Sequence, residues 1–330
     1  MEARYLAGDI GGTKTRLALF SHEKGACEAL EKTTFLSQEY DSLESILRVY
    51  LGDKQHRISG ASFGVAGPII NQKARVTNLK WVVDKTSLQE ILGGVDVHLL
   101  NDLHAIASAV PNLQPGEFEQ LIPGKPDPRG AIGVIAPGTG LGEGFLIWDG
   151  DRYQPHPSEG GHSSFGPQTP LQLELLNYMD DIYSHVSYER VCSGMGIANL
   201  YSFLREAKGL HEPQWLKAQL VEIDDPTPVI AQSALEKSAE ICMQTMDLFV
   251  SILGSEAGNL ALKILATGGI YLGGGIPRRI MPLLQGDTFR DGFLDKGRFA
   301  DMLTHVPVYV ITHPHAGVFG AACHGLQSLH

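Results

Sequence analysis

A glycine turn between two apolar segments near the start of the chain limits the folds open to it. Residues 5–10 and 14–20 have the composition of adjacent strands, and Gly11-Gly12-Thr13 is the turn between them. Glycines can take positive φ angles and leave room for a ligand, and the turn N–H groups with Thr13 can bind an anion. Asp9 would repel bare phosphate, so it suggests an intervening divalent cation. Taken alone, the stretch also fits an ordinary hairpin with a polar turn.

The same pattern returns about one domain later. Residues 131–136 form an apolar segment, a Gly and Thr turn follows at 138–142, and residues 143–148 suit the return strand. Two such hairpins suggest related halves that face one nucleotide. The second has Ala136 and Pro137 in place of the carboxylate, so only the first half would reach a metal. Neither hairpin matches GxxxxGK[ST] or leads into a helix, which excludes P-loop and dinucleotide-binding folds.

A polar pair follows the apolar run at residues 95–100. Asn101 and Asp102 come directly after it, and a helix is predicted to begin at Leu103. Side chains at the carboxyl end of a strand project into the crevice where open α/β sheets bind ligands. Asp102 is therefore a candidate site residue, although it would also serve as the N-cap of the helix.

Three later motifs carry further candidates. Glu159 and His162 lie in a Gly-rich loop and can both reach one hydroxylated ligand, although an exposed loop pair would look the same. Glu189, by itself, is typical of a salt-bridged helix residue. The glycines at 268–269 and 273–275 would let a flat base or ribose lie against the backbone, but tight turn packing also explains several of them.

Periodicity and turn residues predict the remaining elements. We expect the final helix to pack back onto the first domain, and the Pro- and Gly-rich stretch at 111–128 to cross between domains. The other predictions are a third antiparallel strand at 29–35, a helix at 41–51 with Asp41 as N-cap, a strand at 58–65, a helix opened by Thr169, one long helical region at 227–262, a strand at 307–312 and the final helix at 316–327.

Composition limits the possible partners and compartment. The 330 residues are enough for two domains, and the net charge of -11 without a basic run disfavours nucleic-acid or anionic-membrane surfaces. The polar amino terminus and the absence of an apolar run of about 18 residues predict a cytoplasmic protein with no membrane span. The four cysteines lack metal-ligand spacing, which predicts buried free thiols at Cys27, Cys192, Cys242 and Cys323.

Six motifs in this order resemble a bacterial glucokinase of the hexokinase superfamily, and the resemblance covers nearly the whole chain. The related repressor and sugar-kinase family shares the opening DIGGTK stretch but normally carries a CxCGxxGC zinc motif, which is absent here. The zinc-independent branch is therefore favoured, although Lys14 and Pro137 depart from its usual residues. The motifs are Gly8 to Thr13, Leu100-Asn101-Asp102, Gly138 to Gly142, Glu159 to His162, Glu189-Arg190-Val191 with Ser193-Gly194, and Gly273 to Gly275.

The resemblance implies a role for each motif. Glucose hydroxyls would be held by Asn101, Glu159, His162 and Glu189, with Asp102 close to the 6-hydroxyl as general base. This agrees with the position of Asp102 at a strand end, since a primary alcohol needs a group to accept its proton. Asp9 would reach Mg²⁺ through water. The nucleotide would be contacted by Gly8, Asp9, Ile10, Gly11, Gly12 and Thr13, by Gly138, Thr139, Gly140 and Gly142, and by Gly273, Gly274 and Gly275.

The expected fold is a two-domain actin-like ATPase of ribonuclease-H-like α/β type. The small domain would comprise residues 1–110 plus 312–330, and the large domain residues 111–311. The expected activity is ATP-dependent phosphorylation of glucose to glucose 6-phosphate by a homodimer. Three alternatives remain open: a kinase for mannose, fructose or an N-acetylhexosamine, a non-catalytic sugar-binding regulator, and an actin-like ATPase that moves partners.

Overall fold

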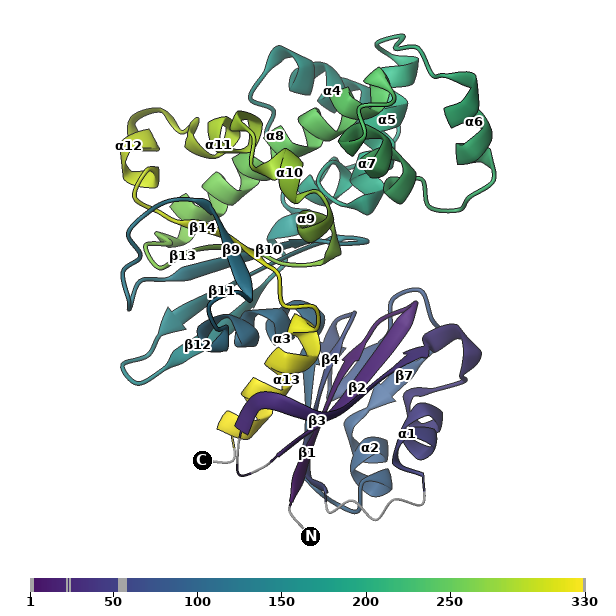
Figure 1. The fold of residues 1–330 in the computed structure, drawn as a ribbon, viewed down its shortest axis with the longest axis vertical. Helices are drawn as coiled ribbons and strands as arrows, with labels where there is room; N and C mark the ends of the chain where they lie inside the picture. The colour runs from purple at the N-terminus through teal and green to yellow at the C-terminus, as the bar shows by residue number, and fades with distance from the viewer. Residues whose placement is uncertain (1–2, 22, 24, 53–57, 329–330) are drawn as a thin grey trace. The chain divides into compact units, whose positions relative to one another are not determined.

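The computed structural model describes residues 3–21, 23, 25–52 and 58–328, with side chains omitted for 25–28 (Figure 1). The chain divides into two compact units, and both are built from discontinuous segments. Unit 1 comprises Met1–Glu117, Tyr153–Pro157 and His313–His330, and unit 2 comprises Phe118–Arg152 and Ser158–Thr312.

Unit 1 contains a five-stranded mixed sheet in the order β3-β2-β1-β4-β8. The predicted opening hairpin is confirmed, and the strand expected at 29–35 lies within β3, antiparallel to β2. Strands β1, β4 and β8 are parallel, with Ile10 beside Val65 and Val65 beside Asn101. The first hairpin turn and Asn101 therefore lie along one edge of the sheet. The strands are β1 (Arg4–Ile10), β2 (Lys14–Ser21), β3 (Gly25–Leu36), β4 (Ile58–Val65) and β8 (Val97–Asn101).

The final helix packs onto the first domain as predicted. In α13 (Ala316–Gln327), Gly320 touches the backbone of α3 (Asp102–Ala109) so closely that a Cβ would collide with the Ala105 carbonyl oxygen. Its buried face shares a core with β1. Unit 1 also contains α1 (Leu43–Leu51), α2 (Lys85–Ile91) and a small sheet of β5 (Ile69–Ile70), β6 (Lys73–Arg75) and β7 (Val82–Asp84), which the sequence did not predict.

The N-cap predicted at Asp41 is wrong by one residue. Ser42 caps α1, because its side chain accepts the hydrogen bond from the Ser45 N–H at 3.3 Å. Both residues are good caps, so the difference is a matter of local backbone geometry.

The sheet of unit 2 repeats the arrangement of unit 1. Its second hairpin is confirmed, with Pro137 opposite Leu141, and β10 pairs in parallel with β13 on its other side. The segment predicted as a crossing contains an edge strand, β9, antiparallel to β14. The strands run β11-β10-β13-β14-β9 and are β9 (Phe118–Ile122), β10 (Ile132–Pro137), β11 (Leu141–Trp148), β13 (Gly269–Leu272) and β14 (Val308–Ile311); β12 (Tyr153–Ser158) follows β11 along the chain.

The long helical region predicted at 227–262 is two helices. Lys237 has a φ angle of 54°, and the Ser238 N–H bonds back to the Ser233 carbonyl oxygen, which ends α7 before α8 begins. Thr169 caps α4 as predicted. The helices of unit 2 are α4 (Pro170–Asp180), α5 (Gly194–Glu206), α6 (Gln214–Val221), α7 (Thr227–Leu235), α8 (Glu240–Ile264), α9 (Gly275–Arg279), α10 (Met281–Leu284), α11 (Asp287–Leu294) and α12 (Ala300–Leu303).

The predicted free thiols are confirmed at Cys192, Cys242 and Cys323, all of which are buried. The side chain of Cys27 lies outside the described residues. Within the described ranges, none of the helices combines the length and apolar character that a membrane span requires.

Candidate active site

Asn101 and Asp102 join β8 to α3 at the edge of the unit 1 sheet. Asn101 is the N-cap: its Oδ1 accepts from the Leu103 N–H at 3.0 Å, and its Nδ2 donates to the Gly67 carbonyl oxygen at 3.3 Å. Asp102 is the first helical residue, and its Oδ1 also accepts from the Leu103 N–H, at 2.9 Å. Helix capping therefore does not depend on Asp102 alone.

The environment of Asp102 makes it a stronger base than an exposed aspartate. Burial raises its pKa to about 6, and the nearby charge of Asp9 adds to this, while the Leu103 N–H acts in the opposite direction. A carboxyl group with this pKa is still mainly ionised at neutral pH. It can accept a proton more readily than a carboxylate in water.

Asp9 supplies a second carboxylate in the same unit. Burial raises its pKa, although the Arg16 guanidinium opposes this shift and donates from Nη1 to Oδ2 at 3.0 Å. The α13 backbone reaches this carboxylate, since a Cβ on Gly317 would lie 3.0 Å from the Asp9 Cγ. The sequence motifs did not indicate a role for Arg16, but the register of the hairpin predicts one, because Arg16 lies directly across from Asp9.

The first hairpin turn is a tight turn without positive φ at either glycine. The Gly11 N–H donates to the Lys14 carbonyl oxygen at 3.0 Å, and Ser37 Oγ donates to the Gly11 carbonyl oxygen at 2.8 Å. A Cβ on Gly12 would lie 2.7 Å from the Thr77 carbonyl oxygen. The expectation about φ is therefore wrong, and Gly12 is required by close packing.

The second hairpin turn, in unit 2, packs against Glu189. The Leu141 N–H donates to Glu189 Oε2 at 3.1 Å, and a side chain at Gly140 would collide with the same oxygen. The Gly138 carbonyl oxygen accepts from the Gly194 N–H at 2.7 Å, which joins the turn to the start of α5.

The glycines at 273–275 lie beside this second turn. The Gly273 N–H donates to the Ile135 carbonyl oxygen at 2.9 Å. Gly274 has a φ angle of 84°, and a Cβ there would lie 2.8 Å from the Pro137 carbonyl oxygen. Two groups of residues predicted to contact the nucleotide are thus neighbours within unit 2.

Unit 2 also brings together three of the residues predicted to bind sugar. His162 Nε2 lies 4.0 Å from Glu159 Oε2, and His162 Nδ1 lies 3.9 Å from Glu189 Oε1. The Glu159 side chain is 84% exposed and that of Glu189 only 21%. Glu159 therefore faces solvent, whereas Glu189 is packed against the second hairpin turn. Glu189 belongs to a short 3-10 turn, Tyr188–Arg190, and its partners are His162 and Leu141.

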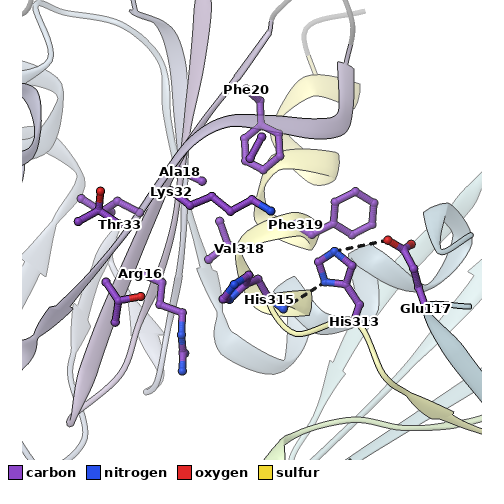
Figure 2. Close-up of a pocket in the computed structure, with 13 residues that line it drawn as sticks. Arg16, Ala18, Phe20, Lys32, Thr33, Glu117, His313, His315, Val318 and Phe319 are labelled. Carbon is purple, nitrogen blue, oxygen red and sulfur yellow. Dashed lines mark hydrogen bonds and ion pairs between the residues drawn. The ribbon is translucent and has the colours of Figure 1, made fainter.

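Unit 1 contains a separate cavity of about 350 Å³ beside Arg16 (Figure 2). Lys32 and His315 are among its lining residues, and the cavity also contains the ring of His313. That ring stacks on Phe319 with the centroids 5.0 Å apart, and its Nε2 lies 3.6 Å from Glu117 Oε1. The motifs in the sequence gave no indication of this cavity.

Comparison with known proteins identifies relatives over almost the full length. The family model described as Glucokinase matches residues 6–328. The glucokinase of Nostoc punctiforme is 41% identical over 332 residues, covering 96% of this chain and 97% of its own. The crystal structure of a glucokinase from an Antarctic psychrotroph has a TM-score of 0.84 at 32% identity, covering 98% of this chain and 99% of its own.

A more distant structure extends the comparison of the fold. The ROK family glucokinase of Streptomyces griseus, solved with glucose and AMPPNP, has a TM-score of 0.64 at 19% identity and covers 97% of this chain and 98% of its own. The prediction of an actin-like ATPase fold is confirmed by these structural matches.

Proposed function

Because the chain belongs to the glucokinase family, we propose that it transfers the terminal phosphoryl group of ATP to the 6-hydroxyl of glucose. The products are glucose 6-phosphate and ADP. The observation that carries the assignment of residues is the half-buried carboxylate of Asp102 at the end of a parallel strand, close to the carboxylate of Asp9.

Asp102 acts as the general base. A primary alcohol holds its proton firmly at neutral pH, so attack on phosphorus needs a group that accepts the proton as the new O–P bond forms. The raised pKa of Asp102 suits it to this task, and its partner Asn101 is fixed by two hydrogen bonds. Asn101 would bind a neighbouring sugar hydroxyl.

Glu159, His162 and Glu189 hold the other hydroxyls of glucose. Carboxylates accept hydrogen bonds, and an imidazole can donate or accept, so His162 between two carboxylates offers both kinds of partner. A ring with several adjacent hydroxyls can satisfy this set together. Such bonds orient the sugar and place its 6-hydroxyl for transfer.

The two glycine hairpins bind the phosphates of ATP, and Gly273, Gly274 and Gly275 contact the adenosine. Backbone N–H groups in such turns can neutralise charge on the phosphates without a long cationic side chain. The open space around Gly138 and Gly275, where an added Cβ would meet no atom within 4 Å, leaves the backbone accessible to a ligand.

Mg²⁺ would be held mainly by ATP and water, with Asp9 as its protein partner. The donor chemistry fits, because Mg²⁺ commonly uses one or two carboxylates with substrate phosphates and several waters. In the described part of the chain there is no cluster of three or more potential ligands that would form a dedicated site. When bound, the ion would supply positive charge that stabilises the transferring phosphoryl group.

The test is ADP release from Mg-ATP by the purified protein with glucose, mannose, fructose or N-acetylglucosamine, each against a no-sugar control. We expect turnover mainly with glucose. Turnover only with another hexose would assign a different kinase, whereas sugar binding without turnover would favour a regulator. Sugar-independent ATP turnover would favour an actin-like ATPase.

We also propose that the enzyme works in the cytoplasm as a homodimer. The family resemblance suggests the homodimer. Light scattering coupled to size exclusion should give about twice the chain mass of 35.8 kDa, and a single-chain mass would reject the dimer.

A further inference from the structure

Two glutamates that the proposed reaction does not use lie in the core of unit 2. Glu143 on β11 is 1% exposed, and Glu256 on α8 is fully buried. Burial of a carboxylate is costly unless other groups compensate its charge, so such a pair needs an explanation.

The two carboxyl groups have different surroundings. Glu256 accepts hydrogen bonds at both oxygens, from Lys263 Nζ at 3.0 Å and from Asn259 Nδ2 at 2.8 Å. Glu143 differs: within the part of the chain that the structure describes, its buried Oε1 has no hydrogen-bond partner. The donors at Glu256 compensate its charge, whereas Glu143 has an oxygen without a partner, so Glu143 is the member that can carry a proton.

The electrostatics agree with this assignment. Burial raises the pKa of Glu143 to about 8, and the adjacent charge of Glu256 contributes, with Lys263 opposing it. A protonated Glu143 can donate a hydrogen bond to the Glu256 carboxylate. At neutral pH the pair would share one proton and carry a single negative charge.

The pair touches the loop that carries two of the sugar-binding residues. A Cβ on Gly160 would collide with Glu143 Oε2, so the backbone of the loop lies against this carboxyl group. Gly161, the next residue, is packed equally closely on the Leu141 carbonyl oxygen. The Glu159–His162 loop therefore lies directly on β11, with the Glu143 carboxyl group beneath it.

The same network reaches the segment that carries Glu189. Besides Glu256, Asn259 Nδ2 donates to the hydroxyl oxygen of Tyr188 at 2.9 Å, and Tyr188 is the residue before Glu189. The pair of glutamates is thus packed against Gly160 on the Glu143 side and is linked to Tyr188 through Asn259 on the Glu256 side.

We propose that Glu143 and Glu256 form a proton-sharing pair that positions both sugar-binding segments, so that glucose affinity depends on Glu143 remaining protonated. This inference rests on the proposed roles of Glu159, His162 and Glu189. Loss of the proton would place two carboxylates against each other in the core, and their repulsion would displace Gly160 and the loop that follows it.

The other ionisable groups around the pair do not account for a change near pH 8. Burial raises the pKa of the Cys192 thiol and of the Tyr188 hydroxyl, so both stay neutral. Lys263 is paired with Glu256. Lys296, which donates to Ser255 Oγ at 3.2 Å, has a pKa lowered by burial, but loss of its charge would act only by increasing repulsion within the pair, which Glu143→Gln removes.

The test compares wild type with Glu143→Gln between pH 7 and pH 9. One pH unit above a pKa of about 8, only ~10% of Glu143 keeps its proton, so the wild-type KM for glucose should rise about tenfold. The KM for ATP should change much less. Glutamine imitates the protonated carboxyl group, so the variant should keep a low and nearly pH-independent KM for glucose.

Glu236→Gln is the matched control, because Glu236 is an exposed residue at the end of α7. It should show the wild-type pH profile. If Glu143→Gln also follows the wild-type profile, or if the KM for ATP rises as steeply as that for glucose, the proposed pair does not position the sugar site.

Infrared spectroscopy separates this proposal from the proposed function. The wild type should show the C=O band of a protonated carboxyl group that disappears near pH 8, and Glu143→Gln should lack that band. If glucose is not phosphorylated but this band and pH-dependent hexose binding by calorimetry remain, only the kinase assignment fails. If the band is absent at pH 7, the shared proton is rejected.

Discussion

The Leu141 N–H donates a hydrogen bond of 3.1 Å to Glu189 Oε2, which joins the second glycine hairpin to a residue predicted to bind glucose. The other oxygen of the same carboxylate lies 3.9 Å from His162 Nδ1. The Glu189 side chain therefore contacts both the turn of the second hairpin and His162. A change at this carboxylate should therefore alter the KM values of both glucose and ATP.

Replacement of Glu189 with Ala should raise the KM for glucose and for ATP together. It removes a sugar contact and also leaves the Leu141 N–H without its acceptor, so we expect an increase of about tenfold or more for glucose and a smaller one for ATP. Glu159→Ala is the matched variant, because Glu159 is not bonded to the turn and should change the KM for glucose alone. Steady-state kinetics with each substrate varied would measure both effects, and an unchanged KM for ATP in Glu189→Ala would contradict the coupling.

Asp102→Asn should reduce kcat by about 10²–10⁴-fold while glucose still binds. The amide keeps the size of the side chain and can still accept from the Leu103 N–H, but it cannot take the proton of the 6-hydroxyl. Single-turnover kinetics would measure transfer, and calorimetry would measure sugar binding. Turnover close to wild type would remove Asp102 from the role of base.

The kcat/KM for glucose should fall on acidification with an apparent pKa near that of Asp102, about 6. Only the ionised carboxylate can accept the proton, so activity should decrease about tenfold per pH unit below this value. The profile would be measured from pH 5 to 7.5 with saturating ATP. If the acidic decrease in kcat/KM instead occurs near the ordinary pKa of an exposed aspartate, burial does not raise the pKa of Asp102.

Wild-type stability should decrease as pH rises from about 4.5, the ordinary pKa of a glutamate, through about 8, the folded-state pKa of Glu143. Across this window the folded protein binds the proton more tightly than the unfolded chain, so raising the pH favours unfolding, by roughly 1 kcal/mol per unit. Glu143→Gln should flatten this dependence. Urea unfolding at several pH values would measure it, with Glu236→Gln as control, and equal slopes in wild type and Glu143→Gln would contradict the raised pKa.

Gly160→Ala should raise the KM for glucose several-fold, because the new methyl group would collide with Glu143 Oε2 and push the loop outward. Gly286→Ala is a suitable control: an added Cβ there would meet only the Leu283 carbonyl oxygen, at an ordinary 3.4 Å, and Gly286 lies before α11, outside the proposed site. Thermal unfolding would check that both variants fold. A normal KM in folded Gly160→Ala would show that the loop tolerates displacement.

The elements that the sequence predicted best are those with strong local signals. Both hairpins have a glycine turn between two apolar segments, and Thr169 precedes a proline at the start of its helix, so local residues were sufficient. The break between α7 and α8 has no glycine or proline to mark it. It depends on Lys237 taking a left-handed φ angle, which apolar periodicity does not reveal.

The site was predictable in its residue types but less so in its connections. Motif order suggested Glu159, His162 and Glu189, and the structure shows their spacing within unit 2. The partnership of Glu143 with Glu256 could not be inferred from the sequence, because each reads as an ordinary charged residue of a strand or a helix. Their interaction joins β11 and α8, which are far apart in the chain.

The packing of α13 against β1 and α3 has a consequence for synthesis of the protein. The first strands leave the ribosome long before the last helix, yet Tyr5 and Ala7 share their core with Val318 and Ala321. Part of the apolar surface of unit 1 therefore stays uncovered until α13 has been synthesised. Unit 2, whose segments end at Thr312, has all its residues earlier and can fold first.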